Sequence, residues 1–211
     1  LNKEAEAYLV PGQPSFLGAF VSGLNDSKNR WSALVECLKT GRPVTSQHAS
    51  GDQKKFFVDL VKRLFSVSYL SGVMLTKKMG VGKTLKQPKI LDVACGSAAW
   101  SIPFAMQDRG TKVVGLDFPE VLSVAKAQVQ KYHLEKQFEF LAADIKQQSF
   151  GVEQFDVIIL GHIVHLLGEA ETKKLLKKCY DALKPKGKIV VAEFFVNDLR
   201  TGPELNLIFA L

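Results

Sequence analysis

Cysteine is scarce in this sequence, and the few cysteines present do not pair. Cys37, Cys95 and Cys179 lie far apart and form no Cys-x-x-Cys motif. Disulfide frameworks and structural zinc sites require paired or closely spaced cysteines. The pattern therefore predicts reduced thiols in a cytoplasmic protein and no bound metal.

Long apolar runs and basic motifs interleaved with aromatic residues are missing as well. No run approaches the roughly 20 residues of a membrane-spanning helix, although 46% of the residues are hydrophobic. The net charge of +7 is moderate. Lysines between 173 and 178 recur at helical spacing, as on a solvated helix face. These patterns predict neither a membrane nor a nucleic acid as partner.

The first part of the chain has helical periodicity only. Helices are predicted over 27–40 and 52–79, with no strand-like alternation between them. Residues 65–75 lose their polar face, so this part of the second helix should be buried on all sides and needs a partner, either another chain or the domain that follows. We therefore predict a helical dimerisation and substrate-lid segment over residues 1–85, and a homodimer built through it.

Strands and helices alternate over residues 86–211, which we predict to be the second domain. The expected strands are 89–93, 112–116, 138–141, 155–160 and 188–195, and the expected helices lie near 98–107, 119–132 and 169–183. Such alternation predicts an α/β fold with a doubly wound, Rossmann-like, mostly parallel sheet. Ligands of these sheets bind at the carboxyl ends of the strands, where Asp92, Asp117, Asp144 and residues 162–165 fall.

The turn after the first strand indicates what is bound there. The sequence Asp-Val-Ala-Cys-Gly-Ser at 92–97 ends an apolar run, and Asp117 closes the next run 21 residues after Gly96. An acid at about this distance accepts hydrogen bonds from ribose hydroxyls. The Gly-x-Gly-x-x-Gly motif of nicotinamide sites is missing. S-adenosylmethionine, which carries an ammonium and a sulfonium but no phosphate, suits the turn better. The alternative is an ordinary strand–turn–helix with a chance acid.

At these residues the chain resembles the class I S-adenosylmethionine-dependent methyltransferases. Within them it is similar to the small-molecule O-methyltransferases with an N-terminal dimerisation domain, such as the caffeate and isoflavone enzymes of plants. The similarity runs from about Tyr8 to the last residue. It implies S-adenosylmethionine as cofactor, S-adenosylhomocysteine as product, and methyl transfer to a hydroxyl of a small aromatic or polyketide-like metabolite.

The resemblance also implies which residues contact the cofactor. In the first turn these are Asp92, Ala94 and Gly96, although Ala94 and Cys95 replace two of the family's three consecutive glycines. Asp117 corresponds to the acid that holds both ribose hydroxyls, and Phe118 follows it.

Two further cofactor contacts follow from the same resemblance. Asp144 corresponds to the acid that takes the adenine amino group, and the side chain of Ile145 would pack on the ring. Gly161 stands where plant members carry a lysine, so its contact would be made by the backbone.

A base that removes the hydroxyl proton is predicted at His165. A neutral histidine near pH 7 suits general-base catalysis. His165 lies 14 residues before Cys179 and 28 before Glu193, and both spacings match those of the family's catalytic histidine. The resemblance thus implies His165 as base and Glu193 as the acid that orients it. The alternatives are a core histidine at 165 and a cofactor-side contact by His162.

Methyl transfer without a metal is the mechanism that the fourth strand favours. This strand ends in Leu-Gly-His-Ile at 160–163, with no acid to hold Mg²⁺. Two other functions stay open. One is C-methylation of a small metabolite or tetrapyrrole, and the other is a catalytically decayed, cofactor-binding dimer that acts through partners.

The last residues suggest an unfinished sheet. Class I methyltransferases close the sheet with two further strands, whereas this sequence ends at Leu211, within a predicted helix over 203–211. Strand 188–195 would then be an open edge, which favours aggregation. We therefore expect the chain to be part of a longer enzyme whose C-terminal strands are missing here, and to be poorly soluble or inactive alone.

Overall fold

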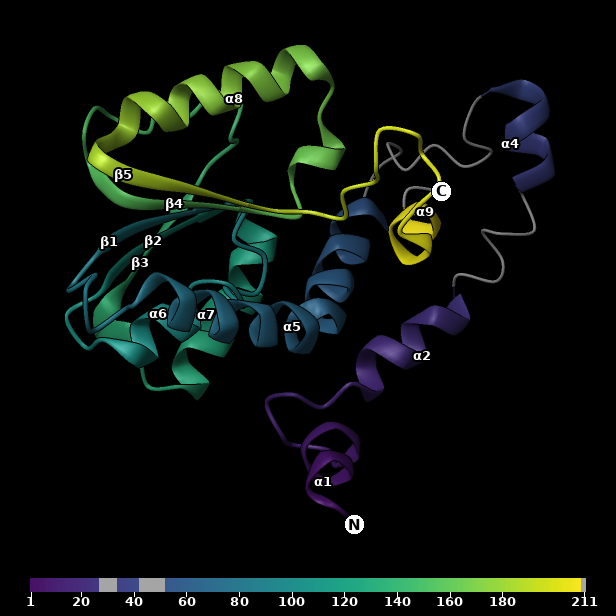
Figure 1. Ribbon diagram of the computed structural model, residues 1–211, viewed down its shortest axis with the longest axis horizontal. Helices are drawn as coiled ribbons and strands as arrows, with labels where there is room; N and C mark the ends of the chain where they lie inside the picture. Colours follow the sequence, from purple (N-terminus) through teal and green to yellow (C-terminus); the bar gives the residue numbers. More distant parts are fainter. Residues whose placement is uncertain (27–33, 42–51, 210–211) are drawn as a thin grey trace.

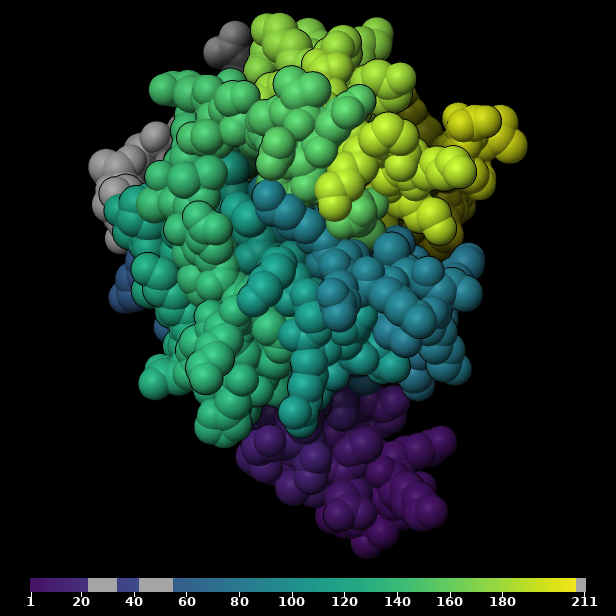
Figure 2. All heavy atoms as spheres, turned by 90° about the vertical axis from the view of Figure 1, so that its left-hand side faces the viewer, coloured from purple at the N-terminus to yellow at the C-terminus, as the bar shows by residue number. Residues whose placement is uncertain are grey.

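The computed structural model of the chain describes residues 1–26, 34–41 and 52–209. The N-terminal part is helical, with α1 (Lys3–Leu9), α2 (Gly18–Asp26), α4 (Leu34–Thr40) and the long α5 (Asp52–Met79). The side chain of Asn2 accepts a hydrogen bond from the backbone N–H of Ala5 at 2.8 Å and so caps α1. In Figures 1 and 2, α1 projects beyond the body of the molecule.

The sequence predicts the long helix of this region and misses the short ones. The helix expected over 52–79 is confirmed. The helix expected over 27–40 is confirmed for 34–40, and residues 27–33 lie outside the described residues. Both α1 and α2 were missed, because their seven and nine residues are too few to show a sustained helical period.

The remainder of the chain forms an α/β layer structure. Its elements are β1 (Lys89–Val93), α6 (Ile102–Gln107), β2 (Lys112–Asp117), α7 (Pro119–Lys131), β3 (Phe138–Ala142), β4 (Phe155–Gly161), α8 (Glu169–Ala182), β5 (Leu183–Ala192) and α9 (Glu204–Phe209). The strands are parallel, in the order β3-β2-β1-β4-β5. Helices α5, α6 and α7 cover one face and α8 the other (Figure 1). This is the predicted doubly wound fold.

The strand order places the ligand-binding edge. The chain moves outward from β1 to β3 and then returns to the other side of β1 with β4. The switch point therefore lies between β1 and β4, and ligands of such sheets bind at the carboxyl ends of the strands there. These ends hold the turn at 94–101 and the segment 161–165.

The central strands are apolar because helices cover both of their faces. In β4, Val157, Ile158, Ile159 and Leu160 are fully buried. Ile158 and Leu160 belong to the core cluster that includes α8, and Val157 and Ile159 belong to the cluster that includes α6. A continuous apolar run is the expected sequence of a strand covered in this way.

Within this chain α5 is buried on one face, which corrects the prediction that 65–75 is buried on all sides. Phe65, Ser68, Gly72 and Thr76 form a buried stripe at helical spacing, because α5 packs on α6 and α7. Met74, by contrast, is 72% exposed. The domain that follows therefore covers one face of the helix and leaves part of the opposite face open.

Strand β5 differs from the predicted strand at 188–195. The sequence predicts a break at Pro185 and Gly187, but α8 leads directly into β5. The register against β4 shifts between Phe155 and Val157, so a bulge takes up the extra residues. A Cβ at Gly187 would lie 2.9 Å from a backbone oxygen, so the bulge requires glycine there.

The end of β5 matters for the site because the strand stops at Ala192. Glu193 is therefore the first residue beyond it, and the expected strand residues Phe194 and Phe195 lie outside the sheet. In the part of the chain that the structure describes, β5 pairs only with β4, as expected of an edge strand. None of the described helices is long and apolar enough to cross a bilayer.

Candidate active site

The turn after β1 is tight and contains residues in the left-handed backbone region. The φ angles of Ala94, Gly96 and Ala98 are 54°, 57° and 57°, a region that favours glycine. Because of this turn, α6 begins at Ile102 rather than at Ala98, which corrects the predicted helix over 98–107. Ala94 therefore keeps the backbone that the family's glycine would adopt, at the cost of strain.

Asp117 connects the ends of β1 and β2. Its Oδ2 accepts a hydrogen bond from the N–H of Gly96 at 2.8 Å, and its Oδ1 accepts one from the N–H of Phe118 at 2.7 Å. A carboxylate can accept about four hydrogen bonds, so two more acceptor positions remain for the predicted ribose hydroxyls. Asp117 thus shapes the glycine turn as well as being placed to bind a ligand.

A second carboxylate lies under the same turn. Asp92 is 1% exposed and accepts a hydrogen bond from Ser101 Oγ at 2.5 Å. Burial raises the pKa of Asp92 to about 7, and the negative charge of Asp117 adds to this increase, while the Ser101 hydrogen bond opposes it. Burial also raises the pKa of Asp117.

This donor set fits the predicted cofactor. Two buried carboxylates, at Asp92 and Asp117, are costly without a cationic or hydrogen-bonding partner. S-adenosylmethionine offers both ribose hydroxyls and positive charge. A Cβ at Gly96 would lie 3.2 Å from Val61 Cγ1 of α5, so glycine keeps the turn close to the helix that covers it.

The residues predicted to contact adenine lie directly after β3. Asp144 Oδ1 accepts a hydrogen bond from the N–H of Lys146 at 2.8 Å. Ile145 packs against the core cluster on the α8 face, and its carbonyl accepts a hydrogen bond from Lys178 Nζ at 2.6 Å. Phe118, after β2, is 53% exposed, so its ring is open to a ligand.

Gly161 ends β4 and is covered by an indole that the sequence analysis did not single out. A Cβ at Gly161 would lie 2.5 Å from Trp100 Cδ1 and 2.6 Å from Trp100 Nε1. The Trp100 ring therefore occupies the place of a side chain at 161, where plant relatives are expected to carry a lysine. A tryptophan eight residues after the strand acid, paired with a glycine at the strand end, is the only trace of this contact in the sequence.

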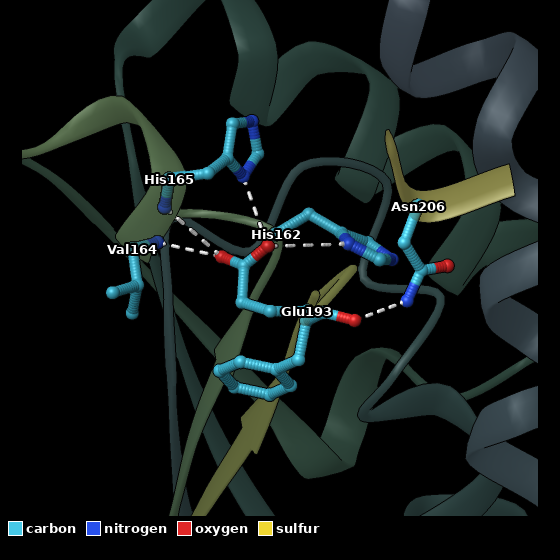
Figure 3. Close-up of polar contacts among 6 residues, drawn as sticks. His162, Val164, His165, Glu193 and Asn206 are labelled. Carbon is cyan, nitrogen blue, oxygen red and sulfur yellow. Dashed lines mark hydrogen bonds and ion pairs between the residues drawn. The ribbon is translucent and has the colours of Figure 1, made fainter. Parts of the chain in front are cut away.

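His165 and Glu193 meet at the carboxyl ends of β4 and β5 (Figure 3). His165 Nδ1 lies 2.9 Å from Glu193 Oε2. The other oxygen, Oε1, accepts hydrogen bonds from the backbone N–H of Val164 at 2.7 Å and of His165 at 3.3 Å. The 28-residue spacing between His165 and Glu193 therefore corresponds to a direct contact of their side chains, because β4 and β5 are neighbours in the sheet. Cys179, the other residue of the spacing, lies instead in the core under α8.

The Glu193 carboxylate is held in its charged form. Its side chain is 6% exposed, and burial alone would raise its pKa. Contacts with His162 and His165 outweigh burial and hold the pKa of Glu193 well below its usual range. A fixed carboxylate on Nδ1 keeps that nitrogen protonated and leaves Nε2 of the imidazole as the basic one.

Comparison with known proteins shows what this chain is similar to. A family model for a methyltransferase domain matches residues 90–187. The chain is 25% identical, over 207 residues, to 3-hydroxy-5-methyl-1-naphthoate 3-O-methyltransferase of Streptomyces sahachiroi, which covers 94% of the chain and 58% of that enzyme. It is 38% identical over 108 residues to demethylmenaquinone methyltransferase of Bacillus cereus, covering 50% of the chain and 44% of that protein.

Solved structures show the same fold. Human N-acetylserotonin methyltransferase, in complex with S-adenosylmethionine, superposes with a TM-score of 0.76 at 21% identity, over 98% of this chain and 61% of that one. The chain thus spans about three fifths of the length of these O-methyltransferases. Residues 90–187 thus match a methyltransferase domain, and the chain has the fold of class I S-adenosylmethionine-dependent methyltransferases. The relative that matches over almost the whole of this chain is a small-molecule O-methyltransferase.

Proposed function

We propose that this chain carries out S-adenosylmethionine-dependent, metal-independent methyl transfer to a hydroxyl of a small aromatic metabolite. The cofactor would lie over the carboxyl ends of β1 and β2, with the ribose on Asp117. His165 would act as the general base, with Glu193 orienting it. Methyl transfer requires an aligned acceptor whose proton has a place to go, and the His165 imidazole supplies that place.

The contact that carries this proposal is the His165–Glu193 hydrogen bond of 2.9 Å. Its carboxylate is buried, charged and fixed by two backbone N–H groups, an expensive arrangement that a core histidine would not need. His165 itself is 38% exposed, so its ring is open to a substrate. The naphthoate enzyme among the relatives suggests hydroxylated naphthoates as the acceptors to try first.

Two measurements test the proposal in sequence. Titration calorimetry with S-adenosylhomocysteine should show one site per chain. A screen of hydroxynaphthoates and related phenols with S-adenosylmethionine should then yield a product heavier by one methyl group, released with S-adenosylhomocysteine. Binding without product from any acceptor would favour the catalytically decayed alternative. No binding at all would contradict the cofactor assignment.

Methyl transfer to carbon is the second candidate, and one observation favours it. A segment of 108 residues is 38% identical to demethylmenaquinone methyltransferase. The same base could remove a proton from an acidic carbon. Proton and carbon NMR of the product separates the two candidates, because an O-methyl and a C-methyl group differ in chemical shift.

A homodimer through the N-terminal helices, residues 1–85, completes the proposal. Support comes from α5, where Met74 is 72% exposed within the uncharged segment 65–75. An obligate interface would bury more than about 2,000 Å². Light scattering should give twice the chain mass, and Met74→Lys should lower it. Met106→Lys, at a 49% exposed position of α6, is the matched control. A monomeric wild-type protein would contradict the dimer.

We also propose that the protein is cytoplasmic, and its thiols support this. Cys37, Cys95 and Cys179 are all free cysteines, which suits the reducing cytoplasm.

A further inference from the structure

A cavity of about 320 Å³ lies beside the candidate base pair. Its lining consists of Val67 and Ser71 from α5, Trp100, His162 and residues 191–195. Among the described residues, its lining includes His162 and Glu193 but not His165. The volume is at the low end of the roughly 300–1,000 Å³ typical of small-molecule sites, and the walls are mostly apolar or aromatic. A flat acceptor of one or two rings suits such a space.

His162 is held rigidly in the wall of this cavity. Its backbone N–H donates to the carbonyl of Ala192 at 2.9 Å, and its φ angle of 57° is in the left-handed region. Its ring stacks on that of Phe194, with centroids 5.0 Å apart, and contacts that of Trp100 at 5.8 Å in a tilted arrangement. A strained backbone that its surroundings hold in place is typical of functional positions.

The two nitrogens of His162 differ in their surroundings. Nδ1 lies 3.8 Å from Glu193 Oε2, the oxygen that also contacts His165, and it has no hydrogen-bond partner among the described residues. Figure 3 shows the Glu193 carboxylate between the two imidazoles. Because a carboxylate only accepts hydrogen bonds, Nδ1 facing it is favoured as the N–H. The lone pair is then on Nε2, on the other side of the ring from Glu193.

We propose that His162 is a specificity-determining residue, whose Nε2 accepts a hydrogen bond from a hydroxyl of the acceptor in this cavity. Glu193 would fix the tautomer of both imidazoles at once, one for the base and one for acceptor recognition. The inference rests on the proposed methyl transfer for its biological meaning. Its physical content, a cavity that prefers a hydroxylated ring, can be tested without turnover.

The first test is the tautomer of His162. Long-range ¹H–¹⁵N NMR of the imidazoles distinguishes the two tautomers, and single-site variants assign the signals of the four histidines. We expect the Nδ1–H form for His162 in the wild-type protein and a mixture of forms in Glu193→Gln. The Nε2–H form in the wild type would overturn the proposal, because Nε2 could then not accept.

The second test measures discrimination between 1-naphthol and naphthalene, which differ only by the hydroxyl. Both affinities are measured by calorimetry in the presence of S-adenosylhomocysteine. The affinity for 1-naphthol divided by that for naphthalene should exceed one for the wild type. His162→Phe keeps a ring in contact with Phe194 and Trp100 but removes both nitrogens, and we expect it to lower the ratio by up to about tenfold. A ratio of one in the wild type, or an unchanged ratio in His162→Phe, would overturn the proposal.

Two further variants keep the test specific. Ser71→Ala removes another polar side chain of the lining, but the Ser71 hydroxyl already donates to Val67, so the ratio should not change. An equal loss in Ser71→Ala would overturn the assignment to His162. Asparagine tolerates the left-handed backbone of residue 162. His162→Asn should therefore fold even if His162→Phe does not, so that a change in its probe ratio reports lost recognition and not misfolding. Failure of the wild type to bind S-adenosylhomocysteine would contradict the proposed function. The probe ratio would then be measured without S-adenosylhomocysteine, and it would still decide the role of His162.

Discussion

Asp92 allows the sharpest prediction, because a carboxyl group is buried where a charge is expensive. Its pKa is raised from 3.8 to about 7. The folded state therefore binds the proton more tightly than the unfolded state does. The stability that this group contributes is present below about pH 4 and is lost as the pH rises toward 7. Three pKa units correspond to about 4 kcal/mol.

Asp92→Asn imitates the protonated form and keeps an acceptor for the Ser101 hydroxyl. We expect the variant to match the wild type near pH 4 and to become more stable as the pH rises, by up to about 4 kcal/mol at pH 8. Urea unfolding of both proteins at several pH values between 4 and 8, without cofactor, measures the difference.

Asp108→Asn provides a control of opposite sign. Hydrogen bonds from the backbone N–H groups of Gln87 and Gly110 lower the pKa of Asp108. Its charged form therefore stabilises the fold at neutral pH, and the variant should be less stable there. The reasoning would be refuted if Asp92→Asn had a lower free energy of unfolding than the wild type at pH 8. It would also be refuted if the difference between their free energies of unfolding did not vary with pH.

The same variant connects stability with ligand binding. If the Asp92 charge is retained for a cationic cofactor, S-adenosylmethionine at saturating concentration should stabilise the wild type more than Asp92→Asn, since ligand stabilisation follows the affinity of the folded state. Equal stabilisation of both proteins would mean that Asp92 has no part in cofactor binding.

Four further changes test the site. Asp117→Ala should weaken S-adenosylhomocysteine binding tenfold to a hundredfold in calorimetry, because a charged acceptor worth about 1.5–3 kcal/mol is lost; unchanged affinity would contradict the ribose assignment. His165→Ala should keep cofactor binding and lose about 10²–10⁴-fold in turnover, and a near-normal rate at every pH would remove it from the mechanism. Glu193→Gln should reduce turnover in the same direction but less, since it only orients the imidazole, so a loss larger than that of His165→Ala would argue against this role. Ala94→Gly should raise the unfolding free energy by about 0.5 kcal/mol, because φ is 54° there, whereas Ala105→Gly in α6 should lower it; a destabilised Ala94→Gly would show that the turn is unstrained.

The fold was largely predictable because periodicity and burial are linked in the α/β part. Strands β1 to β4 and the helix over 52–79 stand out as apolar runs or as an amphipathic repeat, and the structure confirms them. Where the prediction was wrong, a local backbone conformation overrode the pattern. The start of α6 is displaced by the turn at Ala98, and β5 begins at Leu183 through a bulge.

The candidate site divides in the same way. Motif and spacing pointed to Asp92, Asp117, His165 and Glu193, and the structure places each of them at the carboxyl end of a strand. The contribution of Trp100 could not be predicted from the sequence, because its spacing from Asp92 is too weak a signal to place the indole over Gly161.

The sequence by itself thus determined the class of fold, the edge of the sheet where a ligand is expected and the ionisable groups available there, since strand–helix alternation and the residues at strand ends are local patterns. Only the tertiary structure decided how these groups share their contacts. Asp117 turns back to hold Gly96, and one carboxylate, Glu193, contacts both His162 and His165. Such sharing depends on distances of a few ångströms between residues some 20 to 30 positions apart in the sequence. Which side chains come this close is set by the packing of the elements, not by the spacing of residues along the chain.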